Sequence, residues 1–169
     1  AQSAFLYEAQ SQTVLFAKNE DKRMPMASTT KIMTALAALS ALSLDDDYCI
    51  PKEAVGVEGS SAYYRVGETV KIRDLFYALL LQSANDAAVA LAIAADGSLD
   101  DFAARMNRIA DEMGLKDTHF ANPHGLPAEG HYTTARELAL IAAEALAHPF
   151  LREVVRTKTY RSESPEQTR

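Results

Sequence analysis

The sequence predicts an α/β fold in which a cluster of helices packs beside an antiparallel sheet. Two short apolar runs near the N-terminus are separated by a polar link, which is typical of a β-hairpin. Long apolar stretches fill the middle of the chain, and capping sequences mark where helices begin. Because the chain has 169 residues and 48% hydrophobic content, we expect one sizeable core.

The β-hairpin is predicted within residues 1–20. Residues 4–7 and 13–17 are the two expected strands, and the polar residues 8–12 join them. A pair of strands does not make a stable sheet on its own. We therefore expect a missing C-terminal segment, or a second molecule, to complete this sheet.

A helical region is predicted over residues 25–155. Its first helix begins at Ser28 and continues to about Leu42, with alanine or larger apolar residues on every side. This pattern is typical of a helix at the centre of a core. Three consecutive aspartates at 45–47 end the helix, and we expect a solvated turn there rather than a cation site.

The later helices are predicted from turn, capping and proline residues at their ends. A turn and short strand at 67–71 precede a helix that leads to Ser83. Capping boxes at 98–101 and 134–137 begin two more helices, and the second of these ends before Pro149.

Residues 156–169 are predicted to form a strand followed by a polar loop, and alternating side chains at 157–160 indicate the strand. We expect residues 1–169 to form a single incomplete domain: the hairpin, the helical region that carries the motifs, and this strand leading to missing C-terminal strands.

Charge and cysteine content exclude several function classes. The net charge is −6 and the basic residues do not cluster, which argues against nucleic-acid binding. The longest uncharged apolar stretch, residues 87–95, is far shorter than the roughly 20 residues that span a bilayer. Cys49 is the only cysteine, so the chain has no intramolecular disulfide, and we expect this side chain to be buried.

Three histidines, His119, His124 and His131, suggest a metal site as one alternative. They lack the H-x-x-x-H spacing that puts two imidazoles on one face of a helix. We therefore expect them to be turn or pocket-rim residues and expect no metal.

Ser28-Thr29-Thr30-Lys31 carries the strongest chemical signal. Positions i and i+3 of a helix share a face, so the Lys31 amine can lie beside the Ser28 hydroxyl. A neutral lysine could take the serine proton, and burial against apolar neighbours favours the neutral form. The alternative is an ordinary helix N-terminus, although a cation has the wrong sign for that position.

A second polar segment, Ser83-Ala84-Asn85, lies between two apolar stretches. It can be a simple link in which Asn85 or Asp86 caps the next helix. Together with S-x-x-K, it also matches two of the three motifs, S-x-x-K, S-D-N and K-T-G, of penicillin-binding proteins and class A β-lactamases.

The chain resembles the low-molecular-mass penicillin-binding proteins, the serine D-Ala-D-Ala carboxypeptidases of peptidase family S11. The resemblance is carried by four blocks in family order, which extend over nearly the whole chain. These blocks are residues 25–36, 81–88, 124–126 and 132–139.

The resemblance implies a penicillin-binding-protein/β-lactamase-like transpeptidase fold. It implies that Ser28 is the nucleophile, Lys31 its base, Ser83 a proton relay and Asn85 a substrate-binding residue, with no cofactor. The implied substrate is a peptidoglycan stem peptide, which loses its terminal D-Ala, and β-lactams are the implied covalent inhibitors. The implied location is extracytoplasmic in a bacterium, in the periplasm or at the outer face of the cytoplasmic membrane, after signal-peptide removal.

The third family motif, Lys-Thr-Gly, is absent from these residues. The nearest string is Lys158-Thr159-Tyr160, in which a tyrosine replaces the glycine that permits close backbone approach. We expect the parent protein to be an enzyme, and this chain alone to be inactive or impaired.

Two alternatives stay open. One is a binding or sensing module that keeps the fold and reacts with β-lactams without turnover. The other is a β-lactamase, against which Ala84 argues because it replaces the aspartate of S-D-N.

Overall fold

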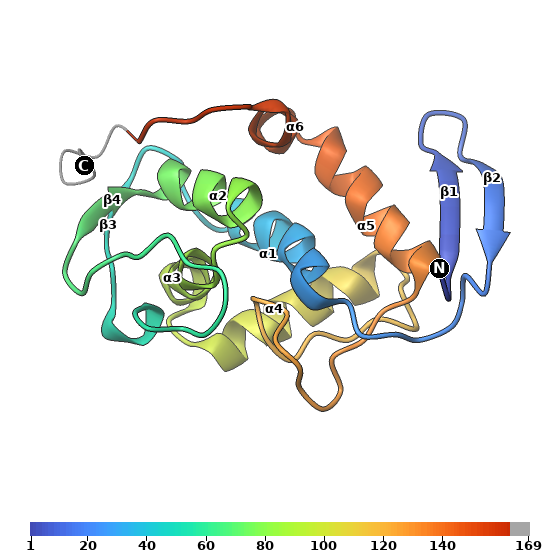
Figure 1. Ribbon diagram of the computed structural model, residues 1–169, viewed down its shortest axis with the longest axis horizontal. Coiled ribbons are helices and arrows are strands. Elements are labelled where there is room, and N and C mark those ends of the chain that lie inside the picture. Colours follow the sequence, from blue (N-terminus) through green and yellow to red (C-terminus); the bar gives the residue numbers. More distant parts are fainter. Residues whose placement is uncertain (163–169) are drawn as a thin grey trace.

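The computed structural model describes residues 1–162, and the chain is a helical cluster with two small sheets (Figure 1). The elements in chain order are β1 (Ala4–Glu8), β2 (Thr13–Lys18), the short 3-10 helix η1 (Ala27–Thr29), α1 (Thr30–Leu39), β3 (Asp47–Cys49), the 3-10 helix η2 (Lys52–Ala54), β4 (Thr69–Lys71), α2 (Ile72–Leu81), α3 (Asn85–Asp96), α4 (Leu99–Glu112), α5 (Ala135–Ala147) and α6 (Pro149–Arg156).

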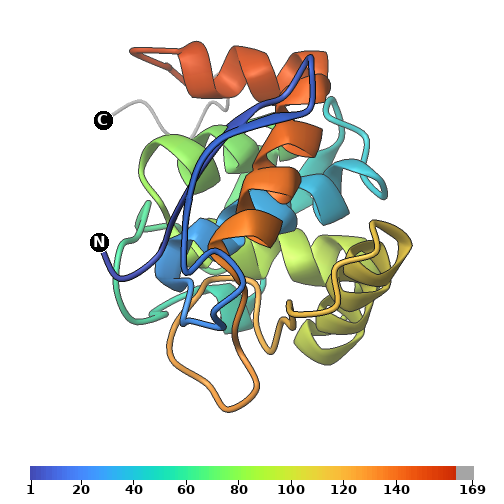
Figure 2. The ribbon, with the colours of Figure 1, turned by 90° about the vertical axis from the view of Figure 1, so that its right-hand side faces the viewer.

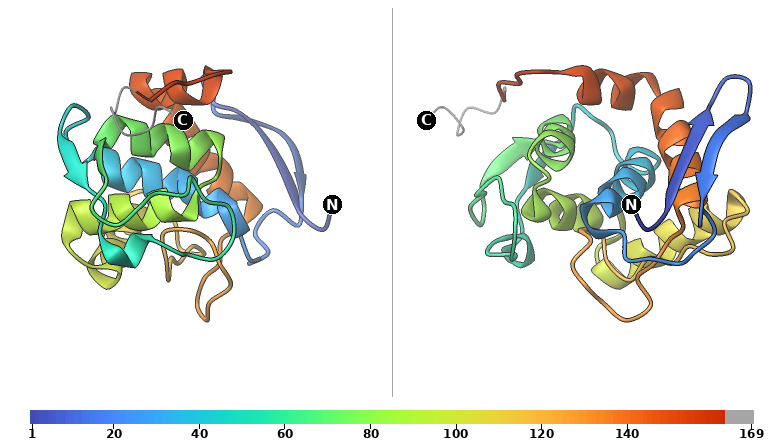
Figure 3. Two further views of the ribbon diagram at one scale, coloured as in Figure 1. Left: turned by 60° about the vertical axis from the view of Figure 1, so that its left-hand side comes forward. Right: turned by 45° about the vertical axis from the view of Figure 1, so that its right-hand side comes forward.

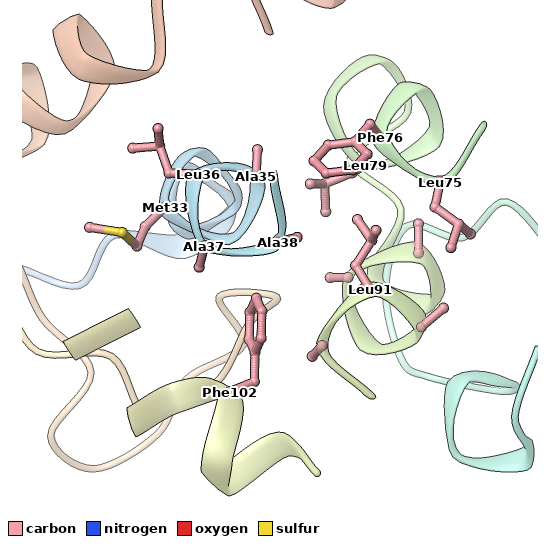
Figure 4. Close-up of a cluster of buried hydrophobic side chains, with 14 of the residues drawn as sticks. Met33, Ala35, Leu36, Ala37, Ala38, Leu75, Phe76, Leu79, Leu91 and Phe102 are labelled. Carbon is pink, nitrogen blue, oxygen red and sulfur yellow. The ribbon is translucent and has the colours of Figure 1, made fainter. Parts of the chain in front are cut away.

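Helix α1 lies at the centre, in contact with α2, α3, α4 and α5. Met33, Ala35, Ala37 and Ala38 of α1 are almost completely buried. Small side chains on α1 let the neighbouring helices approach closely, and the aromatic ring of Phe102 from α4 points at this helix (Figure 4). The predicted central helix is confirmed, although it begins with the turn η1 and α1 ends at Leu39.

The predicted capping boxes fix two helix starts. The Ser98 hydroxyl accepts the Asp101 N–H at 3.1 Å, at the start of α4. The Thr134 hydroxyl accepts the Glu137 N–H at 3.1 Å, at the start of α5. Each side chain satisfies a backbone donor that the first helical turn leaves without a partner.

Strands β1 and β2 pair antiparallel, as predicted, and β3 pairs antiparallel with β4. One face of β1 packs against α5, and β2 lies on the outside of the molecule (Figure 2). Figure 3 shows the hairpin standing apart from the central helices in both views. Within residues 1–162 each sheet has two strands, so no described strand completes the hairpin sheet.

Three expectations at the periphery are wrong or incomplete. Cys49 is exposed, because the alternation of β3 turns Tyr48 toward the core and Cys49 outward. Residues 157–160 form no strand, since no described strand pairs with them. Helix α6 was not predicted as a separate element. Most of the predicted C-terminal loop, residues 163–169, lies outside the described residues.

Asp45 lies in a turn, as expected, but the aspartates do not end the helix, because α1 ends at Leu39 and Asp47 begins β3. Two of them pair with basic side chains: Asp45 with Arg73 at 3.1 Å and Asp47 with Lys71 at 2.8 Å. None of the helices in residues 1–162 has the length and apolar character that a bilayer span requires.

Candidate active site

The predicted pair of Ser28 and Lys31 forms at the start of the central helix. Ser28 lies in η1 and is exposed, whereas Lys31, one turn later, is only 2% exposed. The Lys31 Nζ lies 3.4 Å from the Ser28 Oγ. An accessible hydroxyl therefore stands beside a buried amine.

Burial lowers the pKa of Lys31 from its ordinary value to about 8. The cause is loss of solvation, which penalises the ammonium more than the neutral amine. The Nζ also donates a hydrogen bond to the backbone carbonyl of His124 at 2.8 Å. This contact fixes the direction of the amine while leaving its lone pair available to a proton.

The loop at 119–134 closes against the start of α1, and we call these residues the cradle loop. Its Pro123 carbonyl accepts the Thr34 hydroxyl at 2.6 Å, next to the His124 contact with Lys31. Asn122 braces the loop from inside, because its side-chain oxygen accepts the Gly125 N–H at 2.7 Å. The cradle loop thus holds both the base and the helix that carries it.

Gly125 of the cradle loop lies against the backbone of Ala27, the residue before the nucleophile. Its φ is +90°, and a Cβ at this position would lie 1.9 Å from the Ala27 carbonyl oxygen. No side chain fits there. Gly125 lies in one of the family blocks but had no predicted role, and the close approach to Ala27 together with the positive φ explains the glycine.

Two further residues contact the turn before Ser28. The Thr30 hydroxyl donates to the Ala27 carbonyl at 2.8 Å and lies 2.7 Å from His131 Nε2. Burial, with smaller contributions from His124 and His119, lowers the pKa of His131 to about 4. His131 was expected at a turn or pocket rim, but it is buried and contacts the turn that carries Ser28.

The second predicted segment lies where α2 gives way to α3. Ser83 is half-buried and has a left-handed φ of +55°. Among the hydrogen bonds of the described residues, none joins Ser83 to Ser28 or to Lys31. The structure therefore assembles the first pair directly and leaves Ser83 without a direct bond to it.

Asn85 is the first residue of α3 and is buried. Its amide donates to the Glu58 carbonyl at 2.5 Å, and its backbone N–H donates to the Ser60 carbonyl at 2.7 Å. A Cβ on Gly59 would lie 2.7 Å from the Asn85 Nδ2, so the glycine permits this contact. Asn85 therefore binds the segment at 58–60.

Asp86 organises the continuation of that segment. Its buried carboxylate accepts the Ser61 hydroxyl at 2.6 Å and the Ala62 N–H at 3.0 Å. It also accepts the N–H of Ala87 at 2.9 Å. The expected capping role of Asn85 or Asp86 is wrong, because both lie inside α3, whose N-cap is Ala84 and has no side-chain cap bond. Its bonds to the 61–62 segment had no signal in the sequence, because they depend on a loop about 25 positions away.

The three histidines considered as metal ligands each contact a different group. His131 contacts Thr30, His119 lies 2.6 Å from the Gly130 carbonyl through Nδ1, and the Nδ1 of His124 accepts the Leu126 N–H at 3.2 Å. No group of three potential metal ligands gathers within residues 1–162.

A hollow of about 1080 Å³ lies elsewhere, beside α2. It is lined by residues of the 62–68 segment, α2 and the 158–162 segment, and by none of the four predicted site residues. The size of this hollow does not identify a site, whereas the chemistry of Ser28 and Lys31 does.

Several known proteins are similar to this chain in sequence and in fold. The family model for D-alanyl-D-alanine carboxypeptidase, peptidase S11, matches residues 1–168. D-alanyl-D-alanine carboxypeptidase DacF of Bacillus subtilis is 38% identical over 153 residues, which are 88% of this chain and 39% of that protein. DacC of Escherichia coli is 36% identical over 88% of this chain and 40% of its own length.

Solved structures agree with the sequence matches. The D-alanyl-D-alanine carboxypeptidase DacD of Francisella tularensis has a TM-score of 0.87 and 34% identity, over 92% of this chain and 39% of that one. A mutant of a Streptomyces DD-transpeptidase has a TM-score of 0.90 and 36% identity, over 95% and 66%. The chain thus spans about two fifths of the length of the Bacillus and Escherichia relatives. With this match over nearly its whole length, the chain belongs to the D-alanyl-D-alanine carboxypeptidase family, peptidase S11.

Proposed function

We propose that the protein is a serine D-Ala-D-Ala carboxypeptidase that removes the terminal D-Ala from peptidoglycan stem peptides through an acyl-enzyme on Ser28. The observation that supports this most is the buried Lys31 amine, 3.4 Å from an exposed serine hydroxyl. A lysine whose pKa is lowered by burial has the property that a general base near neutral pH needs.

In the proposed mechanism the neutral Lys31 amine takes the Ser28 proton as the oxygen attacks the carbonyl of the penultimate D-Ala. The tetrahedral intermediate carries a negative oxygen, and the Ser28 backbone N–H, in the first helical turn, would donate to it. Collapse breaks the peptide bond and releases D-Ala as the amine takes a proton. Water then hydrolyses the ester and restores the Ser28 hydroxyl.

Ser83 and Asn85 complete the proposal. Ser83 would pass the proton to the leaving amine, since it lies at the junction before α3, which contacts α1. Such hydrogen bonds are often long in unliganded enzymes and tighten with substrate. The Asn85 carboxamide oxygen would accept a hydrogen bond from the peptide N–H of the substrate, while its amide nitrogen stays on Glu58. The full-length protein would supply the Lys-Thr-Gly motif and a second oxyanion donor.

A second candidate is a penicillin-binding or sensing module that is acylated but does not turn over. Among the described residues Ser83 makes no hydrogen bond to the Ser28–Lys31 pair, and a protein in which Ser83 stayed apart from the pair with substrate bound would protonate the leaving group poorly. A β-lactamase is less favoured because Ala84 stands in place of the aspartate of S-D-N. Because stem peptides lie outside the cytoplasmic membrane, we also propose an extracytoplasmic location.

Intact-mass spectrometry after incubation of the full-length protein with a β-lactam tests the proposal. We expect one covalent adduct in the wild type and none in Ser28→Ala. Release of D-Ala from a peptide that ends in D-Ala-D-Ala then separates the two candidates. An adduct without D-Ala release favours the sensing module, and a folded wild type without any adduct contradicts both.

A further inference from the structure

We infer that His131 is a positioning residue: through Thr30 it fixes the peptide between Ala27 and Ser28, whose N–H is the proposed oxyanion donor. This inference rests on the proposed function, and it concerns how the nucleophile is oriented rather than which residues react. It is carried by a chain of three hydrogen bonds, one buried and two partly buried, that joins the cradle loop to the turn before Ser28.

The hydrogen bonds of His131 determine which of its two ring nitrogens carries the proton. Its Nδ1 accepts the backbone N–H of Ala121 at 3.0 Å, so this nitrogen carries no proton. The proton of the neutral ring is therefore on Nε2, which lies 2.7 Å from the Thr30 hydroxyl and donates to it. Both ring nitrogens are used, and His131 itself is 7% exposed.

The Thr30 hydroxyl links His131 to the Ala27 carbonyl. It accepts from His131, so its own proton is free to donate to the Ala27 carbonyl at 2.8 Å. The Thr30 backbone N–H also donates to the Ala27 carbonyl. Gly125 packs against the same oxygen, because a Cβ there would lie 1.9 Å away. The Ala27 carbonyl is thus held by two donors and one close backbone contact.

The orientation of the Ala27 carbonyl decides where the Ser28 N–H points. The two groups belong to one trans peptide plane and point in opposite directions. Ala27 has a left-handed φ of +46°, which is unfavourable for a residue other than glycine. An unsupported peptide would tend to leave this conformation, so the contacts to the carbonyl hold the N–H in place for the oxyanion.

The contact is not needed to attach the cradle loop. Lys31 binds the His124 carbonyl and Thr34 binds the Pro123 carbonyl, so two other long-range bonds already anchor the loop to α1. Loss of the contact between His131 and Thr30 should therefore change the orientation of the Ala27–Ser28 peptide more than the stability of the fold.

Two amide substitutions separate this role from simple packing. Glutamine places its amide near the position of Nε2, so His131→Gln can still donate to Thr30. Asparagine is one methylene shorter and reaches only the Nδ1 position, so His131→Asn can still accept from Ala121 but loses Thr30. Thr30→Val removes the hydroxyl at nearly constant shape, and Thr30→Ser keeps it. His119→Asn, at an exposed histidine of the same loop, is the control.

The readouts in the full-length protein are the rate constant of β-lactam acylation, the affinity for a peptidyl boronic acid, which forms a tetrahedral adduct, and the thermal midpoint. We expect His131→Asn and Thr30→Val each to slow acylation about tenfold, below the ~10²–10³ that loss of an oxyanion donor costs. Boronate affinity should fall in parallel, and the double variant should be no slower than either single one. His131→Gln, Thr30→Ser and His119→Asn should stay within about threefold of wild type.

The inference is overturned if His131→Asn is acylated at the wild-type rate, if the two effects multiply, or if acylation slows without weaker boronate binding. It is also overturned if His131→Asn and Thr30→Val both fail to fold, because the contact would then be structural. A wild type that is not acylated at all contradicts the proposed function as well, and so distinguishes the two failures.

Discussion

The turn that carries Ser28 and the hairpin β1–β2 differ in how many groups hold them in place. Directly after the Ser28 turn, Thr30, Lys31 and Thr34 of α1 make buried or partly buried hydrogen bonds to groups far along the chain. Every residue of β2 is exposed, and Leu15 and Phe16 are 60% and 54% exposed. The strained backbone at Ala27 lies in the first region, where surrounding contacts can hold it.

Because of this difference, we expect substitutions in the two regions to have different effects. A change near the Ser28 turn should alter reactivity or break the fold, because each group there has a defined partner. A change on the outer hairpin should do little to this chain, because its side chains bury little area against the rest.

The largest effect is expected for Lys31→Met, which keeps the apolar stem and removes the base. We expect β-lactam acylation to fall by roughly 10³-fold, within the range that general bases contribute, and the thermal midpoint to fall as well because the His124 carbonyl loses its donor. The measurement is time-resolved intact mass. Lys18→Met, at an exposed lysine of the hairpin, should leave the rate unchanged. Equal rates in wild type and Lys31→Met would remove Lys31 from the mechanism.

Gly125→Ala should be the most destabilising single methyl group in the cradle loop. Its Cβ would overlap the Ala27 carbonyl, so we expect a loss of about 3 kcal/mol or more in the free energy of unfolding. Gly130→Ala is the matched control, because it also has a positive φ but meets nothing closer than 3.5 Å. It should cost only about 1–2 kcal/mol, from the backbone alone. Denaturant unfolding compares them, and equal losses would show that the close approach at Gly125 is unimportant.

The rate of acylation should depend on the protonation of Lys31. Because burial lowers its pKa to about 8, the reactive neutral amine increases about tenfold per pH unit below that value and saturates above it. A series of acylation rates between about pH 6 and 10 should therefore rise and level off near pH 8. A rate independent of pH below 7 would show that another group takes the proton.

Acid should weaken the Ser28 turn before the hairpin. The pKa of buried His131 is lowered to about 4 from an ordinary value near 6.5, so the folded protein binds this proton less readily than the unfolded chain. Its contribution is fully present above pH 6.5 and is lost as the pH falls toward 4. Thermal midpoints should drop over this window, and His131→Gln, which cannot titrate, should drop less. Identical curves would contradict the buried neutral imidazole.

The smallest effect is expected on the outer face of the hairpin. Leu15→Ala should change the free energy of unfolding by less than about 0.5 kcal/mol, because its side chain is 60% exposed. Leu91→Ala removes the same atoms from a fully buried position, next to Phe76 and Leu79 (Figure 4), and should cost about 3 kcal/mol. Denaturant unfolding of the pair measures the contrast, and similar losses would mean that the hairpin is packed in solution.

The sequence predicted the contacts between residues that are close together in the chain. Ser28 and Lys31 are three residues apart on one face, so their contact follows from helix geometry alone. The N-cap bonds of Ser98 and Thr134 are equally local and formed as predicted. The acidic half of the second capping box did not form, because the Glu137 carboxylate accepts from the 116–118 segment instead. Cys49 was expected to be buried because free cysteines usually are, and nothing in the sequence indicated the three-residue strand that turns its side chain outward.

The other parts of the site depend on long-range contacts. His131 and Thr30 are 101 positions apart, and nothing in the sequence of either segment indicates a contact with the other. The bonds from Asp86 to the 61–62 segment also depend on tertiary structure. Ser83 and Asn85 were singled out by their motif, and their roles stay predictions, because a motif does not give the distance to Lys31.

The span of these contacts has a consequence for how the protein matures. The bonds from α1 to the cradle loop close chain segments of 89, 93 and 101 residues, so they form only when distant parts of the polypeptide have met. Until then Lys31 is solvated, its amine stays protonated, and Ser28 is an ordinary surface alcohol. We therefore expect a newly made or refolding chain to ignore β-lactams until its tertiary structure is complete. Covalent labelling would then report the last stage of folding.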